Sequence, residues 1–303
     1  MSQTAQHPEP GGVPRHDVPT GGRSGYTLIE DRQVHYLEWG YGALPAVLCL
    51  HGGGQTAYMF EDLGATLARR YHVLAIDLPH HGDSDPLDEH GPRAYSETLP
   101  PVLEAFGLET PVLVGASMGG LTSIFLGALR PELVRAIALI DVGHQLEEEG
   151  VQKIIAFLSA HESFGSLEEA AAAIAEYLPF RHRPPDPQRL TRNMRQRPDG
   201  RWEWKHGIHR RVRGPEGAAR IRNWRQTIAG VETAAQSLRC PVLVLRGSES
   251  DVLSDEGAEA VTALIPDARL EVIERAGHLV AGDNPRSTVA LISSFLDELG
   301  ERP

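Results

Sequence analysis

The sequence predicts an α/β protein in which a mostly parallel sheet carries helices on both faces. Six short apolar runs, rich in β-branched residues, recur along the chain with helical patterns between them. These runs hardly alternate with polar residues, which indicates strands covered on both faces, as a parallel sheet requires. At 303 residues with 41% hydrophobic content, the chain can bury one large core.

The expected elements follow one another in a regular order. Two runs near the N-terminus, 26–30 and 34–39, look like an antiparallel pair of strands. The strands expected after them cover residues 46–50, 72–76, 112–115, 136–140, 242–245 and 269–273. Helical patterns cover residues 60–70, 95–106, 118–129, 255–264 and 286–299.

The alternation stops after Ile140 and resumes at Pro241. The residues between them are rich in helix formers, as in 147–160 and 166–177, and then in proline and arginine. A structureless loop of this length is rare in a compact domain, so we expect a helical cap, 144–237, above the carboxyl edge of the sheet. The core domain would then comprise 25–143 and 238–303, and the Pro- and Gly-rich residues 1–24 would form a disordered tail.

Composition narrows the classes of function. The net charge of −12 argues against nucleic acid as a partner, because binding a phosphate backbone needs a basic face. The charge is uneven, since residues 181–225 hold fourteen Lys and Arg against four Asp and Glu. The chain has no apolar stretch of membrane-spanning length and its N-terminus lacks the features of a signal peptide. We therefore expect a cytoplasmic protein with a small-molecule substrate and no membrane partner; its oligomeric state stays open, a homodimer included.

Two cysteines and the histidine spacing give no sign of a metal site. Cys49 and Cys240 lie in or beside apolar strand runs, where a free cysteine packs as a small hydrophobe. No H-x-x-x-H pattern accompanies them, so we expect no metal and no cofactor.

A serine is the strongest candidate for a catalytic residue. The apolar run that starts at Val112 breaks into G-x-S-x-G, with Gly115, Ser117 and Gly119, before a helical pattern begins. This pattern indicates a strand, a sharp turn and a helix, in which the glycines leave room for a turn that holds the hydroxyl above the sheet. Because the pattern is short, an ordinary strand-to-helix turn with an incidental serine is the alternative.

A serine nucleophile needs a base, and the base needs an acid that orients it. After Pro241 the chain contains one histidine, His278, directly past the last expected strand. Asp251 follows the strand at 242–245, and Asp141 follows the strand at 136–140. We favour Asp251 as the acid because the catalytic acid most often follows the penultimate strand, with Asp141 as the alternative. Otherwise Asp251 is a solvated loop charge.

The oxyanion of an acyl-transfer intermediate needs preorganised N–H donors. One comes from the residue after the nucleophile, here Met118, and the second from the loop after the strand at 46–50. That loop reads His51-Gly52-Gly53-Gly54, and Gly53 is the favoured donor, with Gly54 next. Gly52 and Gly54 are also candidates for substrate contact, although a flexible loop without catalytic meaning is the alternative.

The expected cap contains aromatic and basic residues. Trp202, Trp204 and Trp224 are candidates for an apolar substrate pocket, although aromatic residues in a small cap also form its core. The excess of arginine fits a solvated face, ion pairs with the acidic body, or a site for a substrate carboxylate.

As an ordered set, these motifs resemble the serine α/β-hydrolases of the lidded type. The likeness covers about residues 26–143 and 238–299 and includes the glycine loop, the loop 77–84, the serine motif, 247–251 and Gly277-His278. The family's second loop usually reads D-x-x-G-x-G-x-S, and here His80 and His81 replace two of its residues. The resemblance implies the α/β-hydrolase fold, with an eight-stranded sheet and a cap inserted after strand six.

The resemblance also implies a reaction, namely hydrolysis of an ester, thioester or lactone of a small, largely apolar molecule. Two alternatives stay open: a carbon–carbon bond hydrolase that acts on a vinylogous diketone acid, and a hydrolase-like ligand receptor with slow turnover. Dehalogenases and epoxide hydrolases of this superfamily are excluded, because they resemble it with an aspartate where Ser117 stands.

Overall fold

The computed structural model describes residues 18–179, 181, 185–208 and 224–301. Within these residues, eight strands form one sheet in the order β1-β2-β4-β3-β5-β6-β9-β10. β2 is antiparallel to both β1 and β4, whereas the other neighbours are parallel. The predicted mostly parallel, eight-stranded sheet is therefore confirmed. The strands are β1 Arg23–Ile29, β2 Arg32–Trp39, β3 Ala46–Leu50, β4 His72–Ile76, β5 Val112–Ala116, β6 Ala136–Ile140, β9 Val242–Gly247 and β10 Ala268–Ile273.

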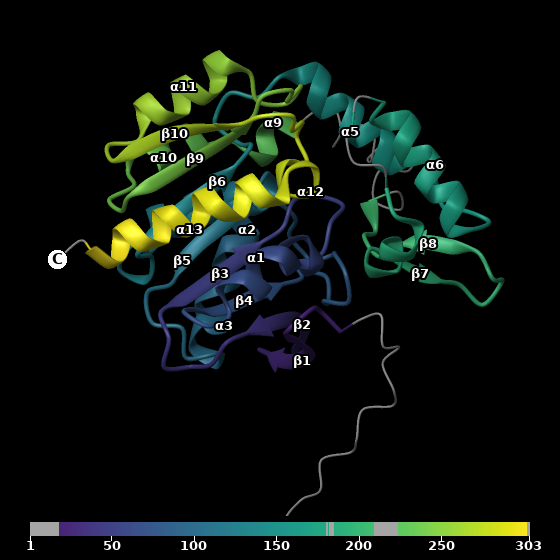
Figure 1. Ribbon diagram of the computed structural model, residues 1–303, viewed down its shortest axis with the longest axis horizontal. Helices are drawn as coiled ribbons and strands as arrows, with labels where there is room; N and C mark the ends of the chain where they lie inside the picture. Colours follow the sequence, from purple (N-terminus) through teal and green to yellow (C-terminus); the bar gives the residue numbers. More distant parts are fainter. Residues whose placement is uncertain (1–17, 180, 182–184, 209–223, 302–303) are drawn as a thin grey trace, which may run out of the picture.

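Helices cover both faces of the sheet (Figure 1). One face carries α2, α3, α4, α10 and α11, and the other carries η2, α1, α12 and α13. The helix predicted over 95–106 is broken at Thr98, because the ring of Pro100 and its missing N–H do not fit a helix interior. The bounds are η2 Ala57–Phe60, α1 Glu61–Leu67, α2 Pro92–Glu97, α3 Leu99–Ala105, α4 Met118–Leu129, η3 Pro131–Leu133, α10 Val231–Gln236, α11 Asp255–Leu264, α12 Val280–Asp283 and α13 Pro285–Glu301.

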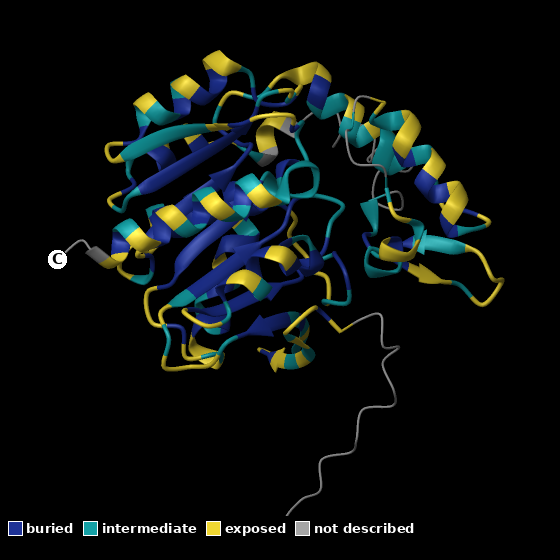
Figure 2. Ribbon diagram, in the orientation of Figure 1, coloured by how far each residue is buried: buried dark blue, intermediate teal, exposed yellow. Residues whose placement is uncertain are grey.

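The core lies on the two faces of the sheet. Successive residues of β3 alternate between them: Leu48 and Leu50 join one hydrophobic cluster, and Val47 and Cys49 join the other. All four side chains are fully buried, and Figure 2 shows the central strands buried along their length. Burial on both faces explains why the strand sequences hardly alternate between apolar and polar residues.

A separate unit lies between β6 and β9, and we call the described part of residues 144–230 the cap (Figure 1). Besides the predicted helices, the cap contains a short antiparallel ribbon, and α10, which lies within the predicted range 144–237, packs into the core. The cap has its own hydrophobic cluster around Phe164, Leu167 and Trp204. Its elements are α5 Glu148–Ala160, α6 Leu167–Tyr177, η4 Pro187–Arg192, β7 Met194–Gln196, β8 Trp202–Trp204 and α9 Trp224–Thr227.

The described residues directly before β1 contact the core through Thr20. Residues 1–17 of the predicted disordered tail lie outside the described residues, but residues 18–24 do not behave as a tail. Thr20 donates hydrogen bonds from N–H and Oγ1 to Glu61 Oε1 at 2.8 and 2.9 Å, and its carbonyl accepts one from Trp39 Nε1. None of the described helices combines the length and the apolar composition of a membrane span.

Candidate active site

Ser117 stands between the end of β5 and the start of α4 in a strained backbone conformation. Its φ of 46° and ψ of −114° lie where side chains rarely fit. A Cβ on Gly119 would lie 2.0 Å from Leu50 O, and one on Gly115 would lie 2.5 Å from Gly119 O. Only glycine fits at these two positions, so the turn predicted from G-x-S-x-G is present at the carboxyl edge of the sheet.

The end of β6 lies next to this turn. Ser117 N–H donates to Ile140 O at 3.0 Å, and Asp141 follows directly with a positive φ of 52°. The Asp141 carboxylate is fully buried and lies 2.8 Å from His278 Nδ1. Because a carboxylate only accepts hydrogen bonds, Nδ1 carries the proton, and Nε2 of the neutral ring is left as its basic atom.

Two further donors reach the Asp141 carboxylate, one from the end of β9 and one from the loop after it. Ser250 Oγ donates to Oδ2 at 2.6 Å, the same oxygen that accepts from His278, and Gly247 N–H donates to Oδ1 at 2.9 Å. Ser250 Oγ also accepts from the N–H groups of Val252 and Leu253. The sequence analysis did not predict a role for Ser250. The one indication of such a role was that Ser250 lies in the loop after β9, which starts at the carboxyl edge of the sheet.

The preference for Asp251 as the orienting acid is wrong. Its side chain is 55% exposed and lies 3.4 Å from Lys153 Nζ of α5. Asp141, named as the alternative, is the carboxylate beside His278. Asp251 is thus a loop charge that faces the cap, and its loop serves the site through Ser250 instead.

The glycine loop after β3 lies beside Ser117. A Cβ on Gly52 would lie 3.4 Å from Ser117 Cβ, whereas a Cβ on Gly53 would meet no atom within 4 Å. Gly54 has a φ of +76°, and an added Cβ would lie 2.7 Å from Leu158 of α5, so the cap covers this loop. The predicted donor Met118 directly follows Ser117 as the first residue of α4, and the predicted donor Gly53 follows Gly52, which contacts Ser117.

His51 holds the glycine loop against the next loop. Its Nδ1–H donates to Gly52 O at 2.8 Å, and its Nε2 accepts from Leu78 N–H at 2.9 Å. The ring is fully buried, and burial lowers its pKa, which favours the neutral form that this donor and acceptor pattern needs.

Trp202 and Trp204, which we considered for an apolar substrate pocket, lie in or against the hydrophobic cluster of the cap. Trp204 is 4% exposed in the hydrophobic cluster of the cap and stacks on His206 with ring centroids 5.7 Å apart. Trp202 packs against the same cluster. Both residues therefore stabilise the cap, and the Trp224 side chain lies outside the described residues.

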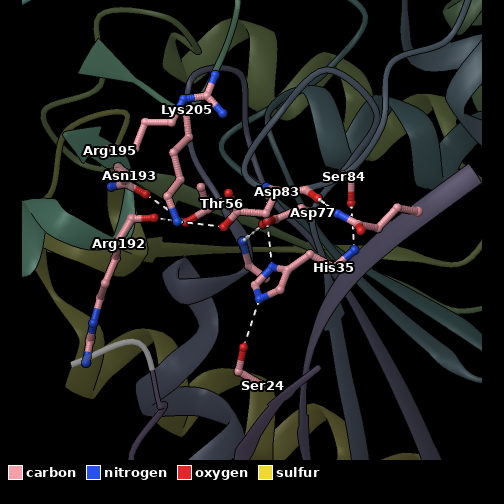
Figure 3. A network of polar contacts seen from close by, with 12 residues as sticks. Ser24, His35, Thr56, Asp77, Asp83, Ser84, Arg192, Asn193, Arg195 and Lys205 are labelled. Carbon is pink, nitrogen blue, oxygen red and sulfur yellow. Dashed lines mark hydrogen bonds and ion pairs between the residues drawn. The ribbon is translucent and has the colours of Figure 1, made fainter. Parts of the chain in front are cut away.

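A polar network links the loop after β4 to the cap (Figure 3). Asp77 accepts from His35 Nδ1 at 2.6 Å and from Asp83 N–H at 3.0 Å. Burial alone would raise the pKa of Asp77, but the hydrogen bond and charge of His35 outweigh it and leave the pKa below its usual value. His35, Asp77 and Asp83 are close enough to share a cation, and the Lys205 ammonium group of the cap lies 2.6 Å from Asp83.

Comparisons with known proteins identify the family and the fold of this chain. Residues 45–285 match the family model described as alpha/beta hydrolase fold. An esterase from Mycobacterium tuberculosis is 29% identical over 281 residues, which cover 89% of this chain and 88% of that protein. A 2-(acetamidomethylene)succinate hydrolase from Mesorhizobium japonicum is 27% identical over 257 residues, which cover 84% of this chain and 89% of that protein.

Solved structures resemble the whole described architecture. The crystal structure of E-2-(acetamidomethylene)succinate hydrolase has a TM-score of 0.79 at 25% identity and covers 91% of this chain and 99% of its own. The crystal structure of an esterase from Mycobacterium tuberculosis has a TM-score of 0.70 at 29% identity and covers 91% of each chain.

Proposed function

Because this chain belongs to the alpha/beta hydrolase family, we propose that it is a serine hydrolase that cleaves an ester, thioester or lactone of a small, largely apolar molecule. The observation that carries the proposal is the 2.8 Å hydrogen bond between His278 and buried Asp141, at the sheet edge where the strained Ser117 turn ends. The similarity to a protein named as an esterase supports it.

In the proposed reaction, Ser117 Oγ attacks the substrate carbonyl carbon while His278 Nε2 takes the hydroxyl proton. Asp141 holds the ring in the tautomer that presents Nε2 and stabilises the imidazolium that forms. The tetrahedral intermediate collapses, the bond to the leaving group breaks, and His278 gives its proton to the leaving alcohol or thiol. Water then attacks the acyl-enzyme by the same route, with His278 as the base.

The N–H groups of Gly53 and Met118 stabilise the negative charge that develops on the carbonyl oxygen. Met118 is the first residue of α4, where backbone N–H groups have no partner within the helix and the helix dipole favours an anion. Open space beside Gly53 allows a carbonyl to approach the loop. Donors of this kind each contribute about 3 kcal/mol to transition-state stabilisation.

The direct test is the reaction of Ser117 with a fluorophosphonate and with p-nitrophenyl esters of short acids. We expect labelling of the wild-type protein at Ser117, and loss of both labelling and turnover in Ser117→Ala. Ser294→Ala, which changes an exposed serine on α13, serves as the matched control. An active Ser117→Ala variant would disprove the proposal, and an unlabelled wild-type protein would favour a ligand receptor.

A second candidate is hydrolysis of a small molecule that carries a carboxylate, by the same residues. The observation that favours it is the similarity to a hydrolase whose name specifies a succinate derivative, in a chain with an excess of basic residues between 181 and 225. Comparing kcat/KM for p-nitrophenyl hemisuccinate and p-nitrophenyl butyrate decides between the two. A preference for the charged ester that disappears in 1 M salt would favour the second candidate.

A further inference from the structure

Asp283 lies between the loop that carries His278 and the cap. It is the last residue of α12, which begins two residues after His278. Its Oδ2 accepts a hydrogen bond from Gly277 N–H at 3.1 Å, so its side chain folds back to the residue before the histidine. Its Oδ1 accepts from Arg181 Nε of the cap at 2.6 Å. One carboxylate therefore joins the histidine loop to the cap.

The Asp283 carboxylate needs the charge that Arg181 brings. The Asp283 side chain is 8% exposed and that of Arg181 is 17% exposed, so water screens the pair weakly. Arg181 is the one ion-pair partner of Asp283 among the residues that the structure describes. An added Cβ on Gly282 would lie 2.7 Å from Arg181 Nη2, so the guanidinium group lies against the backbone of α12. If the cap moved away, a largely buried carboxylate would lose its counter-charge, which is costly.

Other ion pairs also join the cap to the core. Arg192 makes a bidentate pair with Glu61 of α1. Lys205 pairs with Asp83 in the loop after β4 (Figure 3). Neither acid is next in sequence to Ser117, His278 or Asp141. Among the ion pairs that the described residues form between cap and core, that of Arg181 and Asp283 reaches the segment that bears His278.

We propose that Arg181 is a positioning residue that makes the placement of His278 depend on the docked position of the cap. This inference rests on the proposed function. With Arg181 in place, Asp283 keeps its hydrogen bond to Gly277 N–H and fixes the loop in front of His278. Without Arg181, Asp283 turns toward water, the bond to Gly277 is lost, and the imidazole is held by Asp141 alone. The histidine is then best placed for proton transfer only while the cap covers the site.

The test compares the loss of two cap cations. Arg181→Met removes the charge and keeps an unbranched side chain, and Arg181→Lys keeps the charge. Lys205→Met removes another ion pair of similar burial between cap and core. For each protein we would measure the melting temperature, kcat and KM for p-nitrophenyl acetate, and the rate of labelling by a fluorophosphonate. Amide hydrogen exchange of residues 276–283 provides a readout that is independent of activity.

We expect Arg181→Met to lower kcat and the labelling rate about tenfold with little change in KM, because a slightly misplaced base slows the chemical step. Exchange of the 276–283 amides should become faster in this variant, and Arg181→Lys should restore much of both. Lys205→Met should leave kcat within about twofold and leave that exchange unchanged. Equal losses in Arg181→Met and Lys205→Met, or unchanged exchange at 276–283 in Arg181→Met, would overturn the inference. A wild-type protein without labelling or turnover would sink the proposed function, and exchange would then decide alone whether Arg181 orders the loop.

Discussion

The core and the cap of this molecule are held by different interactions. Two large hydrophobic clusters fill both faces of the core sheet, whereas the cap has one small cluster around Phe164 and Trp204 and is fastened to the core by ion pairs. Apolar burial depends on dense packing across many side chains, whereas each of these largely buried ion pairs depends on two side chains and is costly to break. The comparison teaches that the core fixes the geometry of the proposed chemistry through dense packing, whereas the position of the cap depends on a few polar side chains.

The largest expected effect is on kcat, and it distinguishes Asp141 in the core from Asp251, which faces the cap. Asp141→Asn should lower kcat about 10⁴-fold, because an amide favours the wrong tautomer of His278. Asp251→Asn should change kcat by no more than about twofold, since this side chain is exposed. The measurement is steady-state turnover of a p-nitrophenyl ester. A severe loss in Asp251→Asn with an active Asp141→Asn would reverse the assignment of the acid.

The next effect concerns packing in each region. Trp204→Ala should destabilise the cap by about 3–5 kcal/mol, because it empties the centre of a small cluster. The core clusters are untouched, so the melting transition of the core should stay in place while protease cleavage within 144–208 becomes faster. Limited proteolysis followed by mass analysis checks this. A single transition that shifts as a whole would show that cap and core unfold together.

A smaller effect is expected at the loop after β9. Ser250→Ala removes one of three donors to the Asp141 carboxylate and should lower kcat about tenfold, the size of one hydrogen bond to a charged group. Ser248→Ala is the matched control, because Ser248 Oγ accepts from Arg275 N–H and no hydrogen bond links it to Asp141. Equal kcat values for the two variants would remove Ser250 from the site.

The smallest effect is a pH dependence of cap docking. Burial alone would raise the pKa of Glu61, but hydrogen bonds from Arg192 and Thr20 outweigh it and hold the pKa below the ordinary 4.5. The stabilisation is therefore present above that value and is lost as the pH falls through the lower pKa of the folded state. At acid pH we expect the free energy that holds the cap on the core to fall by about 1 kcal/mol, which would appear as faster cleavage of the cap by an acid protease. The variant Glu61→Gln should show no such pH dependence. The same dependence in both proteins would contradict this account.

Sequence reasoning was most reliable where one interaction decides the outcome. The strands at 46–50, 72–76 and 136–140 have the predicted bounds because burial on both faces demands continuous apolar runs. The turn at Ser117 was predictable because no residue larger than glycine fits at 115 and 119. His278 was found because the region after Pro241 offers one histidine.

The choice of acid, the β7–β8 ribbon and the ion pair of Arg181 could not be predicted from local sequence patterns. Asp141 and Asp251 both follow parallel strands, so both end at one sheet edge, and only the loop path turns Asp251 outward. The ribbon of β7 and β8 was missed because each strand has three residues, although the Pro198-Asp199-Gly200 turn between them was a usable signal. Arg181 and Asp283 are 102 positions apart, and nothing in either segment indicates the pair.

The contact of Thr20 with Glu61 has a practical consequence for protein engineering. Glu61 is also the acid that Arg192 uses to fasten the cap, so the chain ahead of β1 and the cap share one carboxylate. A shortened chain that begins after Thr20, or a purification tag that displaces it, is expected to disturb the carboxylate that also holds the cap, without touching the serine turn. The C-terminal end of α13, which lies on the opposite side of the molecule from the cap (Figure 1), is the better place for an affinity handle or a surface linker.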